Sequence, residues 1–80
     1  MKLPRGVSGA ALVKALGRLG YATTRQVGSH VCLTTQVPAL HRVSIPMHDP
    51  LRVGTLAAIL AEVAAARDIE RPELIRQLFG

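Results

Sequence analysis

The histidines at positions 30, 41 and 48 are the side chains of this sequence best suited to proton transfer. Imidazole titrates near neutral pH, so it can take a proton from a hydroxyl group and later return one. His30 completes a Gly-Ser-His triplet of the kind found in tight hairpin turns. One interpretation makes His30 the ordinary first residue of a strand, and the other makes it an exposed acid–base group near Arg25.

A second candidate site lies at Gly54 and Thr55, which are predicted to open a helix. The free backbone N–H groups and the dipole at a helix start can hold an anion such as a phosphate. His48, a few residues earlier, is then a second proton carrier, a phosphate contact or a solvated loop residue. The simpler interpretation is a plain helix start with Thr55 as its cap.

The sequence offers few other sites for chemistry. The three histidines lack the close spacing of metal ligands and only five residues are acidic, so we expect no metal and no cofactor. The single cysteine, Cys32, excludes a disulfide framework and fits a reducing compartment. Because it lies in an apolar strand pattern, we interpret Cys32 as a small core residue rather than a nucleophile.

Charge limits the classes of partner. Ten Lys and Arg residues against five Asp and Glu give a net charge of +5. A dispersed excess of cations is typical of a basic face that attracts polyanions, above all nucleic acids, although solubility alone would also explain it. The cations that we expect to position a nucleic-acid backbone are Lys14, Arg18, Arg42 and Arg52. With only two aromatic residues, recognition by base stacking is not expected.

The elements that must position these residues follow from the periodicity of the sequence. Apolar residues at helical spacing after Ser8, an N-cap candidate, predict a helix that ends at Gly20. Further patterns predict strands over 21–27, 30–35 and 41–45, a helix from Gly54 to Arg67 and a short helix starting at Pro72. We therefore expect one domain over residues 1–80, of the α+β class, with helices packed on one face of a three-stranded antiparallel sheet.

The register of the first hairpin decides on which face of the sheet His30 lies. A two-residue turn places Val27 opposite His30 and Arg25 opposite Cys32. The more apolar alternate positions of the second strand then face the helices, and His30 lies on the open face. A bulge at Gly28 would reverse these faces.

No segment has the character of a signal peptide or a membrane span. Pro4, Arg5 and Gly6 interrupt the start before any apolar stretch forms, and the longest apolar run covers only residues 56–61. We therefore expect a cytoplasmic protein without membrane contact.

Several of these pieces occur in an order and at a spacing that resemble the HicA toxin family. The resemblance extends from Leu3 to Asp68. It rests on Ser8-Gly9 with the apolar positions of the first helix, Gly28-Ser29-His30, the segment 43–48 and Gly54-Thr55-Leu56. It implies an α-β-β-β-α fold like that of double-stranded-RNA-binding domains. It also implies the toxin of a type II toxin–antitoxin system, with a HicB-type antitoxin that covers the active site.

The resemblance further implies ribonuclease activity on messenger RNA, with His30 as the catalytic residue. RNA carries its own nucleophile, the 2′-hydroxyl group. His30 would act as a base toward that hydroxyl or as an acid toward the leaving 5′-oxygen. Arg25 and the helix start at Gly54-Thr55 would stabilise the charge of the phosphorane.

We therefore expect a metal-independent endoribonuclease toxin, that is, an mRNA interferase. Ser29 and His48 are further candidates for contact with RNA. Two other classes of function stay open: a non-catalytic RNA-binding module of the same fold, and a basic domain that only binds an acidic protein.

Overall fold

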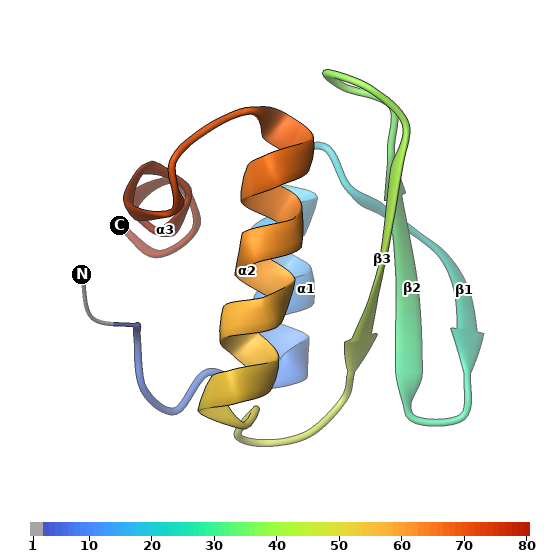
Figure 1. Ribbon diagram of the computed structural model, residues 1–80. Helices are drawn as coiled ribbons and strands as arrows, with labels where there is room; N and C mark the ends of the chain where they lie inside the picture. Colours follow the sequence, from blue (N-terminus) through green and yellow to red (C-terminus); the bar gives the residue numbers. More distant parts are fainter. Residues whose placement is uncertain (1–2) are drawn as a thin grey trace.

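The computed structural model describes residues 3–80, which form three helices and a three-stranded antiparallel sheet (Figure 1). The elements are α1 (Gly9–Gly17), β1 (Ala22–Val27), β2 (His30–Thr35), β3 (His41–Pro46), α2 (Val53–Arg67) and α3 (Arg71–Phe79). The strands are arranged in the order β1-β2-β3. This confirms the α+β class and the α-β-β-β-α order of double-stranded-RNA-binding domains, with α3 as an additional C-terminal helix.

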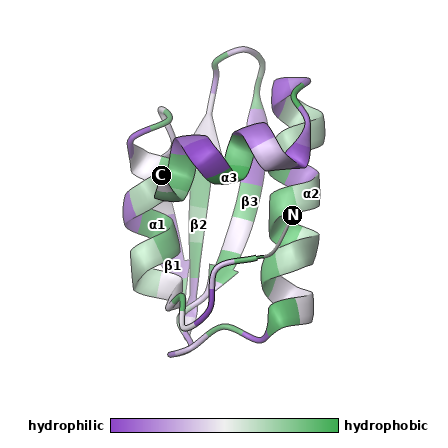
Figure 2. Cartoon of the chain, turned by 90° about the vertical axis from the view of Figure 1, so that its left-hand side faces the viewer, coloured by the Kyte–Doolittle hydropathy of each residue, from purple (hydrophilic) through white to green (hydrophobic). Residues whose placement is uncertain are grey.

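The chain forms three layers (Figures 1 and 2). Helices α1 and α2 both lie on one face of the sheet, α3 crosses them on the side away from the sheet, and the other sheet face is uncovered. All three layers contribute to one apolar core, whose most deeply buried side chains are Leu12, Leu16, Leu33, Ile45, Leu60, Val63, Leu74 and Leu78. Removal of this apolar surface from water is the main force that holds the layers together.

Helix α1 starts as the sequence predicts but ends earlier. The hydroxyl group of Ser8 accepts a hydrogen bond from the N–H of Ala11 at 3.0 Å, so Ser8 is the N-cap. The α-helix stops at Gly17 instead of reaching Gly20, because the next three residues form tighter i→i+3 hydrogen bonds. Gly20 has a left-handed φ of +103°, which turns the chain toward β1.

The hairpin of β1 and β2 has the predicted register. Val27 pairs with His30 and Arg25 pairs with Cys32. Buried and accessible side chains alternate along β2, and His30 occupies an exposed position, as predicted. The strand irregularity lies at Thr24 and not at the turn, so the orientation of His30 is unaffected.

Helix α2 begins at Val53, with Arg52 in the N-cap position and no capping side chain. Thr55 therefore lies inside the first turn and is not the cap that the simpler interpretation of the sequence made it. The reason is that Arg52 already has the extended backbone that precedes a helix, and its carbonyl oxygen accepts the first helical hydrogen bond, from the N–H of Leu56 at 2.9 Å. The predicted apolar stripe of α2 is confirmed by the burial of Leu56, Ile59, Leu60 and Val63.

Helix α3 begins with Pro72 in its first turn, as predicted, and buries Leu74, Ile75 and Leu78. In the described part of the chain, no helix has the length and apolar character needed to cross a membrane.

Candidate active site

A pocket opens where the lower end of the sheet in Figure 1 meets the start of α2. It encloses about 920 Å³, within the ~300–1,000 Å³ that is typical of ligand sites. The residues that line this histidine pocket are His30, Ser44, Pro46, His48, Asp49, Pro50, Arg52, Thr55, Ala58 and Ile59. Of the residues that the sequence singles out, the pocket thus brings together His30, His48, Arg52 and Thr55.

Backbone hydrogen bonds fix the segment that carries His48. The N–H of Met47 donates to the carbonyl oxygen of Ser29 at 2.7 Å, which ties this segment to the turn just before His30. The carbonyl oxygen of His48 accepts a hydrogen bond from the N–H of Gly9 at 2.8 Å, at the start of α1. Both histidines are therefore held at one pocket, although they belong to different elements.

Gly9 makes this close approach of α1 possible. A Cβ atom at position 9 would collide with the carbonyl oxygen of Pro46 and would lie 2.9 Å from the Cα atom of Met47. Gly9 is buried at this contact. In the sequence it stands out only as part of the Ser8-Gly9 pair, and the reason for a glycine there is visible only in the packing.

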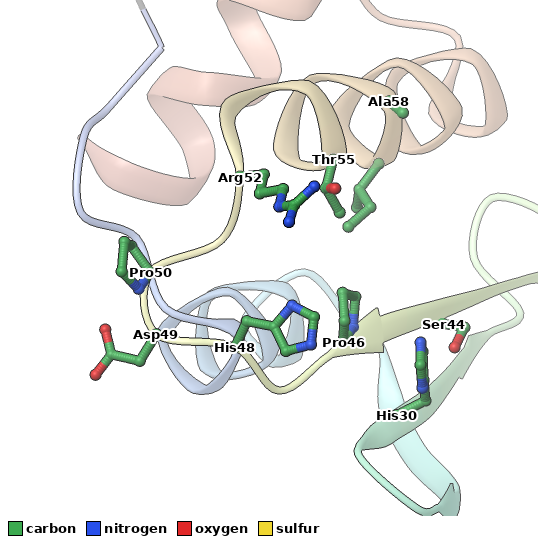
Figure 3. A pocket seen from close by; sticks show the side chains of 10 residues that line it. His30, Ser44, Pro46, His48, Asp49, Pro50, Arg52, Thr55 and Ala58 are labelled. Carbon is green, nitrogen blue, oxygen red and sulfur yellow. The ribbon is translucent and has the colours of Figure 1, made fainter.

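Two imidazole rings and a guanidinium group border the histidine pocket from different elements (Figure 3). His30 stands at the start of β2 with its ring beside Ser44, His48 extends from the loop after β3, and Arg52 extends from the residue before α2. All three of these charged or titratable side chains are exposed. A ligand can therefore reach two proton-transfer groups and one fixed positive charge without any opening of the structure.

The start of α2 adds hydrogen-bond donors to the same pocket. Helical hydrogen bonding begins with the N–H of Leu56, so the N–H groups of Val53, Gly54 and Thr55 have no acceptor within the helix. No side chain caps them, and Thr55, half-buried, lines the pocket. Together with the helix dipole, these donors favour a phosphate group at this point.

The other predicted site residues lie outside the histidine pocket. A second hollow on the uncovered face of the sheet, the sheet groove, is lined by Thr24, Arg25, Cys32, Thr34, Gln36, Leu40, Arg42, Val43 and Ser44. The interpretation of Cys32 as a core residue is therefore wrong, because strand alternation puts its half-buried side chain on the uncovered face. Arg25 and Arg42 therefore share a surface with each other and not with Arg52. Arg25 is absent from the residues that line the histidine pocket, because that pocket forms at the end of the sheet and Arg25 lies further along β1.

Lys14 and Arg18 line a third hollow, between α1 and α3. The guanidinium group of Arg18 donates a hydrogen bond to the carbonyl oxygen of Leu78 at 2.6 Å, so it stabilises the contact between the two helices. Ser29 contributes its backbone carbonyl group to the tie with Met47, and Gly54 lies in the first turn of α2 without lining the pocket.

The third histidine, His41, makes a hydrogen bond within the fold and lies away from the pocket. His41 pairs with Thr35 at the end of the sheet remote from His30, and its Nδ1 atom is hydrogen-bonded to the hydroxyl group of Tyr21 at 2.7 Å. Burial raises the pKa of Tyr21, with a lowering contribution from Arg67 and a further raising contribution from Glu62. His41 therefore takes no part in the histidine pocket.

Two polar residues of the histidine pocket, Ser44 and Asp49, were not predicted as site residues. Ser44 lies between two buried residues of β3, so the alternation of that strand alone could have placed it on the open face. Asp49 follows His48 directly, but its carboxylate group points away from the two imidazole rings (Figure 3). Within residues 3–80, no three His, Cys, Asp or Glu side chains come close enough to hold a metal ion.

Of the comparisons with known proteins, the one with family models gives a match. No curated protein and no solved structure matches the chain. The family model described as HicA toxin of bacterial toxin–antitoxin systems matches residues 9–64, a segment that begins at Gly9 and includes every residue lining the histidine pocket. Since that segment is more than half of the chain and carries the motifs noted in the sequence, this protein belongs to the HicA toxin family, the toxins of bacterial toxin–antitoxin systems.

Proposed function

We propose that this toxin is a metal-independent endoribonuclease that cleaves messenger RNA, with His30 as its catalytic residue. The observation that supports the proposal is the histidine pocket, where His30 and His48 share one accessible hollow with Arg52 and the free donors of α2. Cleavage of RNA by its own 2′-hydroxyl group needs proton carriers and a positive environment for the phosphorane, and these groups can supply both.

The chemistry can proceed without a deep pocket because RNA supplies the nucleophile. The 2′-oxygen attacks the adjacent phosphorus, the bond from phosphorus to the 5′-oxygen breaks, and the products are a 2′,3′-cyclic phosphate and a 5′-hydroxyl group. His30 takes the proton from the 2′-hydroxyl group or gives one to the leaving 5′-oxygen. Either role accelerates such a reaction by ~10²–10⁴-fold.

The groups that would stabilise the phosphorane lie on the side of the pocket formed by Arg52 and the start of α2. Arg52 and Thr55, whose N–H group has no acceptor within α2, line the pocket on this side. Arg52 takes the role that the sequence suggested for Arg25, which lies in the sheet groove, and the helix start keeps the role suggested for it. Donors that already point at the site stabilise developing charge without reorganisation during the reaction.

The decisive variant is His30→Ala. We expect it to lose RNA cleavage and to permit normal growth when it is expressed, while its free energy of unfolding changes by less than about 1 kcal/mol, because an exposed strand residue adds little to the core. The measurements are cleavage of a labelled transcript, growth after induction, and chemical unfolding followed by circular dichroism. His41→Ala, which also removes an imidazole but outside the pocket, is the matched control and should keep cleaving at temperatures below its melting midpoint.

Equal cleavage by His30→Ala and the parent protein would contradict the assignment. Retained RNA binding with no cleavage by either protein would instead indicate a non-catalytic RNA-binding module. Cleavage should persist in saturating EDTA and should leave 2′,3′-cyclic or 3′-phosphate ends. Activity that disappears in the chelator and returns with a divalent ion would mean a metal-dependent mechanism.

A further inference from the structure

The sheet groove and the histidine pocket are adjoining surfaces. Ser44 lines both hollows, so the groove continues from the pocket onto the uncovered face of the sheet. Cys32 pairs with Arg25 on one side and with Ser44 on the other, which places these three residues in one row across the sheet. A chain molecule that leaves the pocket past Ser44 therefore runs directly onto this row.

The groove is lined by hydroxyl groups and cations. The irregularity of β1 at Thr24 puts two consecutive residues, Thr24 and Arg25, at the groove. The hydroxyl oxygen of Thr24 lies 3.2 Å from that of Thr34 on β2, and Arg42 pairs with Thr34 from β3. Hydroxyl groups and guanidinium groups are the side chains that commonly contact phosphates and sugars.

The positive charge of the groove is not compensated. Arg25 and Arg42 are both exposed, and the ion pair found within the described residues joins Arg76 to Glu73, far along the chain. All five acidic residues of the protein follow His48 in the sequence, so the sheet contains none. The groove therefore favours an anionic occupant.

The two arginines are separated by a distance that suits one extended strand. Arg25 and Arg42 lie on the outer strands, two strands apart and two residues apart along the sheet, so standard sheet geometry puts their Cα atoms about 12 Å apart. They are thus able to contact different phosphates of a single nucleic-acid strand.

We infer that the sheet groove binds the single-stranded RNA segment next to the cleavage site, with Arg25 and Arg42 each on a backbone phosphate. This inference rests on the proposed function, since it identifies the substrate as unpaired RNA that passes from the groove into the histidine pocket. A single strand can bend around Ser44 from one hollow into the other, whereas a stiff duplex cannot follow that path. Because neither hollow is lined by a Phe, Tyr or Trp side chain, we expect the contacts to hold the backbone rather than to read bases.

The test measures binding of a fluorescent RNA strand of about ten nucleotides, a length typical of single-strand sites. Its 2′-oxygens carry methyl groups, so it cannot be cleaved by 2′-oxygen attack and the result does not depend on the role of His30. We expect Arg25→Ala and Arg42→Ala each to raise the Kd about tenfold and to lower the slope of log Kd against log salt by about 0.7. Arg71→Ala removes the same charge at the start of α3 and should leave that slope unchanged.

Several outcomes would overturn the inference. An equal, small effect of all three substitutions would mean that only the overall charge attracts RNA. Unchanged RNA affinity together with weaker antitoxin binding would make the groove a protein-binding surface. A duplex of the same sequence that competes as well as the single strand would exclude unpaired RNA as the preferred ligand.

The control for misfolding is substitution by lysine. Arg25→Lys and Arg42→Lys keep the charge, so they should restore most of the salt slope that the alanine variants lose and so exclude misfolding as the cause.

Discussion

Gly9 stabilises the site because it has no side chain, which lets α1 pack directly against the end of β3. Its N–H donates to the carbonyl oxygen of His48, and its Cα atom lies so close to Pro46 that no side chain fits between α1 and the end of β3. The segment that carries His48 is thereby held between the start of α1 and the turn before His30. The geometry of the histidine pocket therefore depends on a residue that does not line it.

We expect Gly9→Ala to lower the free energy of unfolding by about 1–3 kcal/mol, the usual cost of forcing extra atoms into a packed contact. RNA cleavage should fall as well, because β3 and the loop after it must move away from α1. Gly17→Ala is the matched control, since a Cβ atom there meets nothing within 4 Å and alanine favours helices over glycine. A Gly9→Ala protein as stable and as active as the Gly17→Ala protein would contradict this role.

At the residue scale, the sequence predicted correctly the features that follow from strand alternation. The pairing of Val27 with His30 and the exposed position of His30 follow from a two-residue turn and a period of two. The sequence could not show that His48 and Arg52 face His30 while Arg25 does not. That arrangement depends on the backbone hydrogen bonds of the loop after β3, whose partners, Ser29 and Gly9, lie far away in the chain.

At the scale of elements, α3 is the part of the fold that the family match leaves out. The match ends at residue 64, whereas α3 spans Arg71–Phe79 and buries Leu74 and Leu78 almost completely. It forms the third layer, across α1 and α2 (Figure 2). Helix α3 is therefore part of the core of this protein and not an appendage.

Leu74→Ala should lower the free energy of unfolding by about 2–5 kcal/mol, as expected for truncation of a fully buried leucine. Chemical unfolding measures this directly, and cleavage assayed well below the melting midpoint should persist because α3 lies away from the histidine pocket. Gln77→Ala, at an exposed position of the same helix, should change stability by no more than about 0.5 kcal/mol. If the two substitutions had the same small effect, α3 would not be part of the core.

Element boundaries were harder to predict than the elements themselves. All of the predicted helices and strands exist, yet α1 ends at Gly17 and α2 starts at Val53. Near Gly20 the hydrogen bonds shorten to i→i+3 while the apolar pattern continues, so the pattern does not reveal the end of the α-helix. At the start of α2, a candidate cap such as Thr55 is misleading because no side chain fills the capping role.

At the scale of the whole molecule, the uneven charge suggests how the antitoxin binds. The histidine pocket and the sheet groove are adjoining surfaces that carry Arg25, Arg42 and Arg52, and the sheet itself has no acidic residue. A toxin needs a partner that blocks it in its own cell. We propose an acidic domain of a HicB-type antitoxin that buries His30 and contacts several of these arginines.

Association of toxin and antitoxin should then be fast at low ionic strength and should slow about tenfold or more as salt rises. Stopped-flow fluorescence measures the rate, and Arg52→Ala should slow association more than Arg71→Ala does. A structure of the complex gives an independent answer. A rate that does not depend on salt, or a solvent-open His30 beside a bound antitoxin, would favour inhibition from the helical side.

The backbone ties around the histidine pocket have a consequence for the order of events during synthesis of the chain. The pocket needs Gly9 from the first helix, Ser29 from the hairpin, the loop after β3 and the first turns of α2 at the same time. No nascent chain that stops short of Ile59 contains the complete set of lining residues. A ribosome that makes this toxin is therefore exposed to an assembled site only after most of the protein has left the exit tunnel.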